Sequence, residues 1–353
     1  MKKSYAFLAG LALMSAFTAC SSDDDVMNVA KTGTQLSIKS VGVEGVDTKA
    51  GITAAAFSGS EEIGVYINSG NLGAKYDQDV DYENIIYKAT SGTAWATTQT
   101  ITLSNIAGTV RAYYPYSADN GVYTPGQDDL PNDGTAIKLR VNSTQGTGIA
   151  GGAADDPNQI DYMWADPVTN VNSSKPDVRL QMNHALAMVS FQFKNSADVP
   201  YPGVGKITKI RLYNADGKSV LKAGPATMNI NDGQITLDPT ASVSDISVEP
   251  DAASLKDETT LNNQPRMLVY PAQATGANSI GAGDVKAEIV MDGVTFTLEL
   301  PAITNGYEPN KNYQYNVTLK GVEMEIDEVS IKQWGLQAQG AVDMQDPDNQ
   351  QRS

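Results

Sequence analysis

The clearest structural signal in this chain lies in Val285-Lys-Ala-Glu-Ile-Val-Met-Asp-Gly-Val-Thr-Phe-Thr-Leu-Glu-Leu300. Apolar residues occupy every second position up to Asp292-Gly293 and every second position again after it. An Asp-Gly pair between two runs of period two is the strongest short-range signal for a tight β-hairpin. This stretch therefore predicts two antiparallel strands, each with one buried face.

Similar runs recur along the rest of the chain. Met228–Leu237 alternates around Asn231-Asp-Gly233, and Tyr313–Leu319 forms another alternating run. With 31 glycines and 16 prolines in 353 residues, turn residues are frequent. Short strands at this spacing are typical of β-sandwiches. We predict an all-β protein with one antiparallel sandwich over residues 51–183 and a second over 184–334, the boundary lying near His184.

The charge of the chain limits its partners. Its formal net charge is −16 at pH 7. A surface this acidic repels phosphate backbones, so we expect no nucleic-acid partner. Past the N-terminal region no apolar run is long enough to cross a bilayer, so we expect no membrane span there.

The N-terminus has the features of an export signal. Lys2 and Lys3 precede a short apolar run, and Phe17-Thr18-Ala19-Cys20 resembles a lipobox, at which a lipoprotein is acylated on its cysteine and cleaved before it. Cys20 is the only cysteine of the chain. We predict a signal peptide over residues 1–19 and a lipid on Cys20; the alternative is a secreted protein with one stray thiol.

Residues 20–50 form a leader of mixed character. Ser21-Ser-Asp-Asp-Asp25 is either an acidic export tag or a solvated spacer. One strand is expected around Leu36–Val43, and Lys49 forms an exposed basic site before Ala50. At the other end, residues 335–353 are polar, but Leu336, Ala338, Val342 and Met344 share one parity. That segment is either a strand or a disordered tail.

No catalytic constellation is visible. His184 is the only histidine, and its apolar neighbours favour a packed residue over a catalytic one. Zinc sites need several Cys or His ligands, which this chain lacks. Residues 129–134 and 229–233 resemble fragments of calcium loops but are better explained as turns. We expect no enzyme, no metal and no cofactor.

Two features could bind a ligand. Tyr113-Tyr-Pro-Tyr116 could stack on sugars, although such tyrosines more often cover the edge of a sandwich. Gly146–Asn158 is a Gly/Ala/Asp-rich loop long enough to be mobile or functional.

Several segments together resemble the fimbrillin family of Bacteroidales-type (type V) pili, in its minor-fimbrillin-like branch. After the acidic leader they are, in family order, Thr48-Lys49-Ala50, Glu62-Ile-Gly-Val-Tyr-Ile67, Tyr114-Pro-Tyr-Ser117, Asp161-Tyr-Met-Trp-Ala165, Leu180-Gln-Met-Asn-His-Ala-Leu186, Leu268-Val-Tyr-Pro271, and Tyr313-Gln-Tyr-Asn-Val-Thr-Leu319 with Trp334. Each motif is weak alone, and the ordered set is fairly specific.

The resemblance implies two transthyretin-like sandwiches and an assembly route. A lipoprotein lipidated on Cys20 reaches the outer membrane, and an Arg/Lys-specific protease cuts after Lys49, with Lys39 as a second possible cut. The cut frees the groove that Leu36–Val43 had filled. A terminal strand of another fimbrial subunit, carried here by Leu336, Ala338, Val342 and Met344, then enters the groove by β-augmentation.

Two other hypotheses remain. A monomeric surface lipoprotein, as an anchor, tip or glycan- or host-ligand-binding module, could share every feature except the donor strand. An enzyme built around His184 is the third.

Overall fold

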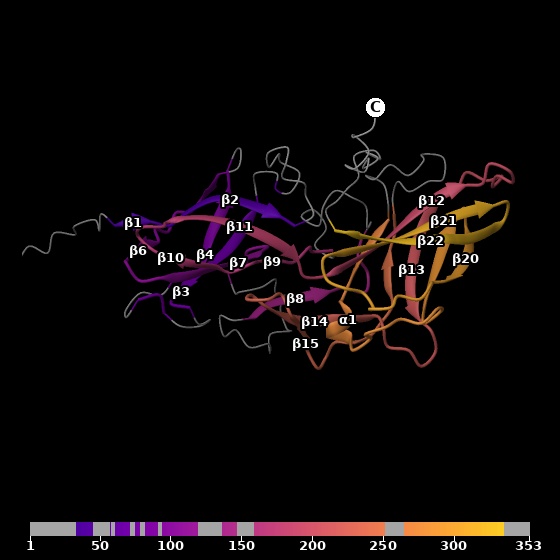
Figure 1. Cartoon of the computed structure of the whole chain (residues 1–353). Helices are drawn as coiled ribbons and strands as arrows, with labels where there is room; N and C mark the ends of the chain where they lie inside the picture. Colours follow the sequence, from indigo (N-terminus) through magenta and orange to yellow (C-terminus); the bar gives the residue numbers. More distant parts are fainter. Residues whose placement is uncertain are drawn as a thin grey trace, which may run out of the picture. The chain divides into compact units, whose positions relative to one another are not determined.

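The structure is a computed structural model that describes residues 33–44, 57, 61–70, 75–77, 82–90, 94–118, 136–146, 159–250 and 265–334. Within these ranges regular structure is almost entirely β, apart from the four-residue helix α1 (Ala272–Thr275) (Figure 1). The predicted all-β class is confirmed. No helix in the described part of the chain has the length and apolar character needed to cross a membrane.

The first sandwich is built around one large sheet. Its strands follow the order β2-β11-β9-β7-β3-β4-β5, with β10 paired to β7, and a small second sheet pairs β1 with β6. The bounds are β1 (Thr34–Gln35), β2 (Ser37–Val43), β3 (Glu62–Asn68), β4 (Tyr82–Ala89), β5 (Trp95–Ala96), β6 (Thr102–Leu103), β7 (Gly108–Tyr114), β9 (Met163–Ala165), β10 (Val168–Val171) and β11 (Asp177–His184).

The second sandwich has two four-stranded sheets, β18-β12-β21-β22 and β17-β13-β19-β20. A further sheet joins β8, β14, β15 and β16. The bounds are β8 (Ala136–Val141), β12 (Ala187–Asn195), β13 (Ile207–Asn214), β14 (Lys222–Asn229), β15 (Ile235–Leu237), β16 (Ser242–Val243), β17 (Ile246–Val248), β18 (Arg266–Val269), β19 (Val285–Met291), β20 (Val294–Glu299), β21 (Lys311–Lys320) and β22 (Glu323–Gln333).

The hairpin expected from the Asp-Gly pair is present as β19 and β20. Asp292 and Gly293 take φ values of 49° and 79°, the left-handed conformation that this tight turn requires. The alternate residues of β19 are buried, as expected. On β20 the pattern holds only near its end, because the strand lies at the sheet edge and Val294, beside the turn, is 51% exposed.

Two clusters of buried residues form the cores. One contains side chains of β2, β3, β7 and β11, and the other is centred on β12, β13, β19 and β21. Although β8 comes early in the chain, it pairs with β14 and buries Ile137, Leu139 and Val141 in the second core. The domain boundary near His184 stays a prediction. The two cores do not correspond to two continuous halves of the sequence, because β8 precedes His184 and packs in the second core.

Buried tyrosines predict loss of stability at alkaline pH. Burial raises the pKa of the Tyr87 and Tyr307 hydroxyls from 10.0 to about 12. The folded chain therefore holds these protons to higher pH than the unfolded chain does. Their contribution to the free energy of unfolding is complete below about pH 10 and is lost as the pH rises through about 12. Each group lowers the free energy of unfolding by about 1.4 kcal/mol per pH unit in this range.

Urea denaturation at pH 8 to 11.5 measures this slope. The Tyr87 hydroxyl is buried without a hydrogen-bond partner among the described residues, so Tyr87→Phe should keep the stability at pH 8 and make the slope shallower. An unchanged slope in Tyr87→Phe would assign the alkaline transition to other groups.

Candidate functional site

The segment from Thr34 to Glu44 is held by both sheets of the first sandwich. β1 pairs antiparallel with β6, and β2 pairs in parallel with β11 at the sheet edge. Between them the Leu36 N–H donates to the Ile101 carbonyl at 3.0 Å, and beyond them the Glu44 N–H donates to the Met182 carbonyl at 2.7 Å. We call residues 34–44 the leader strand.

The leader strand contributes side chains to the core. Leu36, Ile38, Val41 and Val43 are between 3% and 7% exposed. They lie in one cluster with Val178, Leu180 and Met182 of β11. The pairing with β11 shifts register between Val178 and Arg179, and this β-bulge explains why the buried positions change parity between Ile38 and Val41.

These contacts make the leader strand energetically important. Burial of one such side chain contributes about 1.5–3 kcal/mol, so the four together contribute roughly 6–12 kcal/mol. The free energy of unfolding of a whole domain is only about 5–15 kcal/mol. Without the leader strand, β11 would expose an unpaired edge beside an open apolar groove. A chain that loses this strand therefore needs another strand in its place.

Lys39 is the bulged residue of the leader strand, between Ile38 and Ser40, which pair with Val178 and Arg179 of β11. Its side chain points to solvent and forms an ion pair with Asp177, with 3.2 Å between Nζ and Oδ1. The other predicted site residues, which are Cys20, Lys49, Ala50, Leu336, Ala338, Val342 and Met344, lie outside the described residues.

Asn310 contacts both Glu44, at the end of the leader strand, and Trp334. The Asn310 side-chain amide donates to the Glu44 carboxylate. The Asn310 carbonyl accepts the Trp334 N–H at 2.9 Å. Trp334 in turn stacks on the His184 ring, with 4.1 Å between ring centroids. One asparagine thus contacts both the last described residue of the leader and the last described residue before residues 335–353.

His184 is organised as a packed residue. Its Nδ1 lies 2.8 Å from Asp161 Oδ1, while its Nε2 is buried and has no hydrogen-bond partner among the described residues. Ser-His or Cys-His catalysis requires the second ring nitrogen to bond a nucleophile. The geometry favours the structural interpretation of this histidine.

The tyrosine cluster is also tied into the fold. Tyr113 is fully buried, and its hydroxyl bonds the Asn84 side chain at 2.9 Å and the Ser117 carbonyl at 2.9 Å. Tyr114 packs edge-on against Phe57, which packs against Trp95. These contacts favour the covering role of the cluster over stacking on sugars.

The turn at residues 229–233 uses its polar side chains for its own backbone. Asn229 Oδ1 accepts the Asn231 N–H, and Asp232 Oδ1 accepts the Gln234 N–H. The described residues contain no group of three acidic, His or Cys side chains suited to a metal ion. Residues 129–134 lie outside the described ranges.

Two glutamines flank the predicted loop 146–158 and bond the edge strand β18. The Gln145 side chain donates to the Leu268 carbonyl and accepts the Leu268 N–H, both at 2.7 Å. Gln159 donates to Gln145 at 3.2 Å and to the Arg266 carbonyl at 2.8 Å. This clamp was not predicted from the sequence, in which glutamines at both ends of a Gly/Ala/Asp loop were its only signal.

Solved structures share this fold. A candidate cell adhesion protein from Bacteroides uniformis ATCC 8492 matches with a TM-score of 0.57 and 16% identity, over 85% of this chain and 98% of that one. A second, from Bacteroides ovatus ATCC 8483, matches with a TM-score of 0.55 and 19% identity, over 86% and 99%. A fimbrial protein from Bacteroides vulgatus ATCC 8482 matches with a TM-score of 0.52 and 16% identity, over 85% of this chain and 99% of that one. None of the curated proteins compared with the chain matches it.

The fold is therefore one found in solved fimbrial and candidate cell adhesion proteins, built from β-sandwiches. The sequence profile described as Fimbrillin-like matches residues 48–334. The chain belongs to the fimbrillin-like family, which confirms the resemblance noted in the sequence. Membership supports a role as a fimbrial subunit that associates with other subunits at the cell surface, and the family is one of structural proteins and not of enzymes.

Proposed function

We propose that this chain is a structural, adhesion-serving subunit of a cell-surface fimbria that is exported as an outer-membrane lipoprotein and assembled by strand exchange. Cys20 carries the lipid, and a protease specific for Arg or Lys cuts after Lys49. The leader strand then leaves, and a strand of another subunit takes its place against β11. Leu336, Ala338, Val342 and Met344 are the donor positions that the chain offers in return.

The observation that carries this proposal is the placement of the leader strand. It is an edge strand, it is paired in parallel with β11, and it supplies four buried side chains to the first core. It also lies before residue 48, where the match to the family begins. A replaceable edge strand is the geometry that β-augmentation uses: ladder hydrogen bonds supply affinity, and alternate side chains fill pockets.

The surroundings of Lys39 support a cut at Lys49. A protease needs an extended substrate segment in its own active site, and the residues around Lys39 are hydrogen-bonded to β11. Cleavage there would first require the leader strand to open. Lys49 lies beyond Glu44, the last residue of the leader strand.

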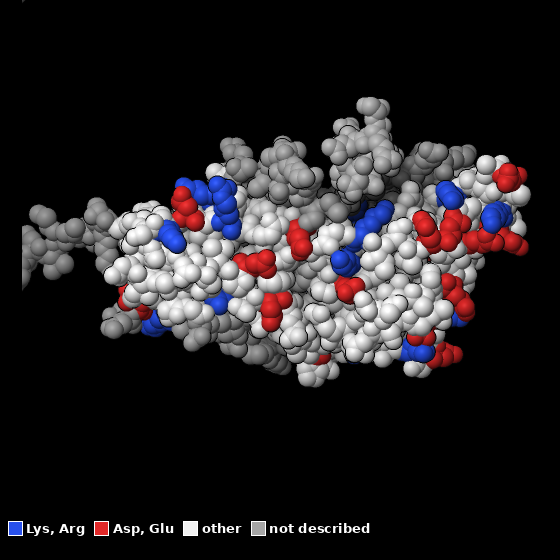
Figure 2. All heavy atoms as spheres, in the orientation of Figure 1, with Lys and Arg blue, Asp and Glu red and all other residues white. Residues whose placement is uncertain are grey.

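β22, the longest edge strand among the described residues, differs from β11 in its charge. β22 carries exposed acidic residues at Glu323, Glu325, Asp327 and Glu328. Acidic and basic side chains are interspersed over the region of the β21–β22 hairpin (Figure 2). Charged edges discourage strand addition. This difference supports β11, once uncovered, as the acceptor edge, and a head-to-tail contact of this kind builds open filaments.

Processing should depend on Lys49 and not on Lys39. We expect a trypsin-like protease to convert the purified chain into a product that begins at Ala50 and forms filaments. Lys49→Gln should block both steps, whereas Lys39→Gln should leave both unchanged. Intact mass, N-terminal sequencing and electron microscopy measure the outcome, and removal of residues 335–353 should preserve cleavage but abolish filaments.

Two results would contradict the proposal. A surface-derived chain that still begins at acylated Cys20 would indicate a permanent anchor. Filaments formed equally well by the chain without residues 335–353 would remove the donor role from that segment.

A further inference from the structure

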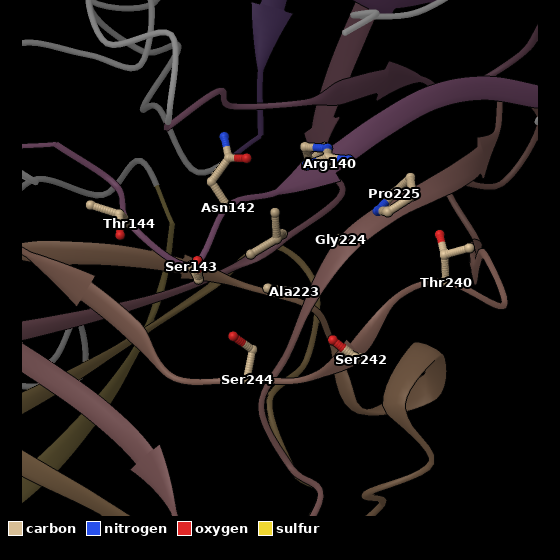
Figure 3. Close-up of a pocket in the computed structure, with 11 residues that line it drawn as sticks. Arg140, Asn142, Ser143, Thr144, Ala223, Gly224, Pro225, Thr240, Ser242 and Ser244 are labelled. Atoms are coloured by element: carbon tan, nitrogen blue, oxygen red, sulfur yellow. The ribbon is translucent and has the colours of Figure 1, made fainter. Parts of the chain in front are cut away.

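A polar cleft lies beside β8 and β14, in the part of the chain that forms the second core. Its volume is about 460 Å³, within the range of small-ligand sites. Figure 3 shows Arg140 at one end of the cleft, Ser244 at the other, and the β14 backbone at Ala223 and Gly224 between them. The remaining lining residues are Val141, Asn142, Ser143, Thr144, Pro225, Thr240 and Ser242.

The Tyr270 hydroxyl bonds the backbone of two residues that line the cleft, Val141 and Gly224. It accepts the Val141 N–H at 3.1 Å and donates to the Gly224 carbonyl at 2.6 Å, although Val141 and Gly224 are register partners of β8 and β14. The phenol thus stands between the two strands. Beyond Val141 the chain leaves β14 for β17, where the Ser143 carbonyl accepts the Ser247 N–H at 2.7 Å.

The backbone of these two lining residues is therefore fixed by the fold before any ligand arrives. Tyr270 is 2% exposed, and burial raises the pKa of its hydroxyl far above the ordinary value, so the hydroxyl stays protonated and keeps both bonds. The Arg140 N–H is held in the same way by the buried Tyr162 hydroxyl at 3.3 Å. Preorganised walls reduce the entropy lost on binding.

Arg140 brings a positive charge that no carboxylate among the described residues neutralises. Its half-buried side chain forms no ion pair with any described carboxylate. Arg211 shows the usual arrangement in this acidic chain, with Asp245 at 3.0 Å and Glu288 at 2.7 Å. A guanidinium offers a planar pair of N–H donors that matches a carboxylate.

Free hydroxyls line the rest of the cleft. The side chains of Ser143, Thr144 and Ser242 have no hydrogen-bond partner among the described residues. The hydroxyls of Thr240 and Ser244 are already used, bonding the Asp238 carboxylate and the Asp245 carbonyl. Hydroxyls that can donate and accept are suited to the hydroxyl groups of a saccharide.

We propose that this cleft binds an acidic sugar residue, with the sugar carboxylate on Arg140 and the ring hydroxyls on Ser143, Thr144 and Ser242. The lining residues include no aromatic side chain on which a sugar ring could stack, so the affinity for one residue should be low, with a Kd of about 1 mM. Repetition of the site along a filament would raise the avidity. This inference goes beyond the proposed assembly and does not depend on it.

Ligand-observed saturation-transfer NMR on the purified monomeric chain tests the proposal with three probes. Glucuronic acid carries the carboxylate and the hydroxyls, glucose lacks the carboxylate, and acetate lacks the ring. Glucuronic acid should bind roughly 10-fold or more tightly than either of the others, because only it uses both parts of the cleft.

Two arginine variants provide the control. Arg140→Gln should remove the preference for glucuronic acid over glucose. Arg179→Gln makes the same change at an exposed arginine of β11 that also has no ion pair within the described part of the chain, and it should keep the preference. Equal binding of glucuronic acid and glucose, an unchanged preference in Arg140→Gln, or acetate binding as tight as glucuronic acid would each overturn the proposal. Filament formation by Arg140→Gln should be normal, so failure here leaves the assembly proposal intact.

Discussion

Ile38→Asp should lower the free energy of unfolding by about 5 kcal/mol, because it removes a buried side chain and places a carboxyl group in the first core. Ile38 is 3% exposed and is the register partner of Val178 on β11. The variant chain should have a first sandwich that unfolds before the second, since the second core contains no residue of the leader strand. Urea denaturation followed by hydrogen exchange of β11 amides measures both effects.

The pH dependence distinguishes the introduced charge from the lost packing. Burial would raise the pKa of the new carboxyl group above its unfolded value of about 4. The folded variant would then be least destabilised below that pH and would lose stability as the pH rises through the raised pKa. Ile38→Val, which keeps the apolar character, should cost only about 0.5–1.5 kcal/mol at every pH.

Lys39→Asn is the control for Ile38→Asp at the neighbouring position. Lys39 lies on the same strand, and its ion pair with Asp177 is solvent-exposed, so its loss should cost less than about 1 kcal/mol. If Ile38→Asp were as mild as Lys39→Asn, the leader strand would not be a component of the core. The groove that strand exchange requires would then have no physical basis.

The sequence predicted features that depend on neighbours along the chain. The alternation of Val285–Met291 and the Asp292-Gly293 turn specify a hairpin locally, and β19 and β20 form it. The strand near Leu36–Val43 was also predictable from its apolar residues. The place of β8 beside β14 was not, because that pairing depends on the topology of the whole chain and leaves no local pattern.

The bulge in the leader strand is a second feature that the local sequence pattern does not predict. Ile38 and Val41 are three residues apart, which weakens a period-two pattern in the sequence. The register shift opposite Val178 brings both side chains into the core. Polar side chains that act as backbone partners, such as Gln145 and Tyr270, give at most a weak signal, because any exposed loop can carry the same residues.

Gln145→Ala should lower the free energy of unfolding by about 3–5 kcal/mol. The Gln145 side chain is 1% exposed and serves both backbone groups of Leu268, and its amide also donates to the Asn142 carbonyl at 3.0 Å. Alanine would leave these buried groups without partners, and each such group costs about 1–3 kcal/mol. Urea denaturation measures the loss, and Gln234→Ala, which truncates an exposed glutamine, should stay within about 0.5 kcal/mol of the parent chain.

Gln145→Glu shows whether Gln145 stabilises the fold through its hydrogen bonds or only through the volume of its side chain. One carboxylate oxygen could still accept the Leu268 N–H, but the other would face the Leu268 carbonyl, to which the amide now donates. The folded variant would therefore favour the protonated acid, and the pKa of the new group would lie above its unfolded value. Stability should approach that of the parent below about pH 4 and fall as the pH rises through the raised pKa. A deficit in Gln145→Glu that does not change with pH would mean that the clamp on β18 acts by packing and not by pairing its edge.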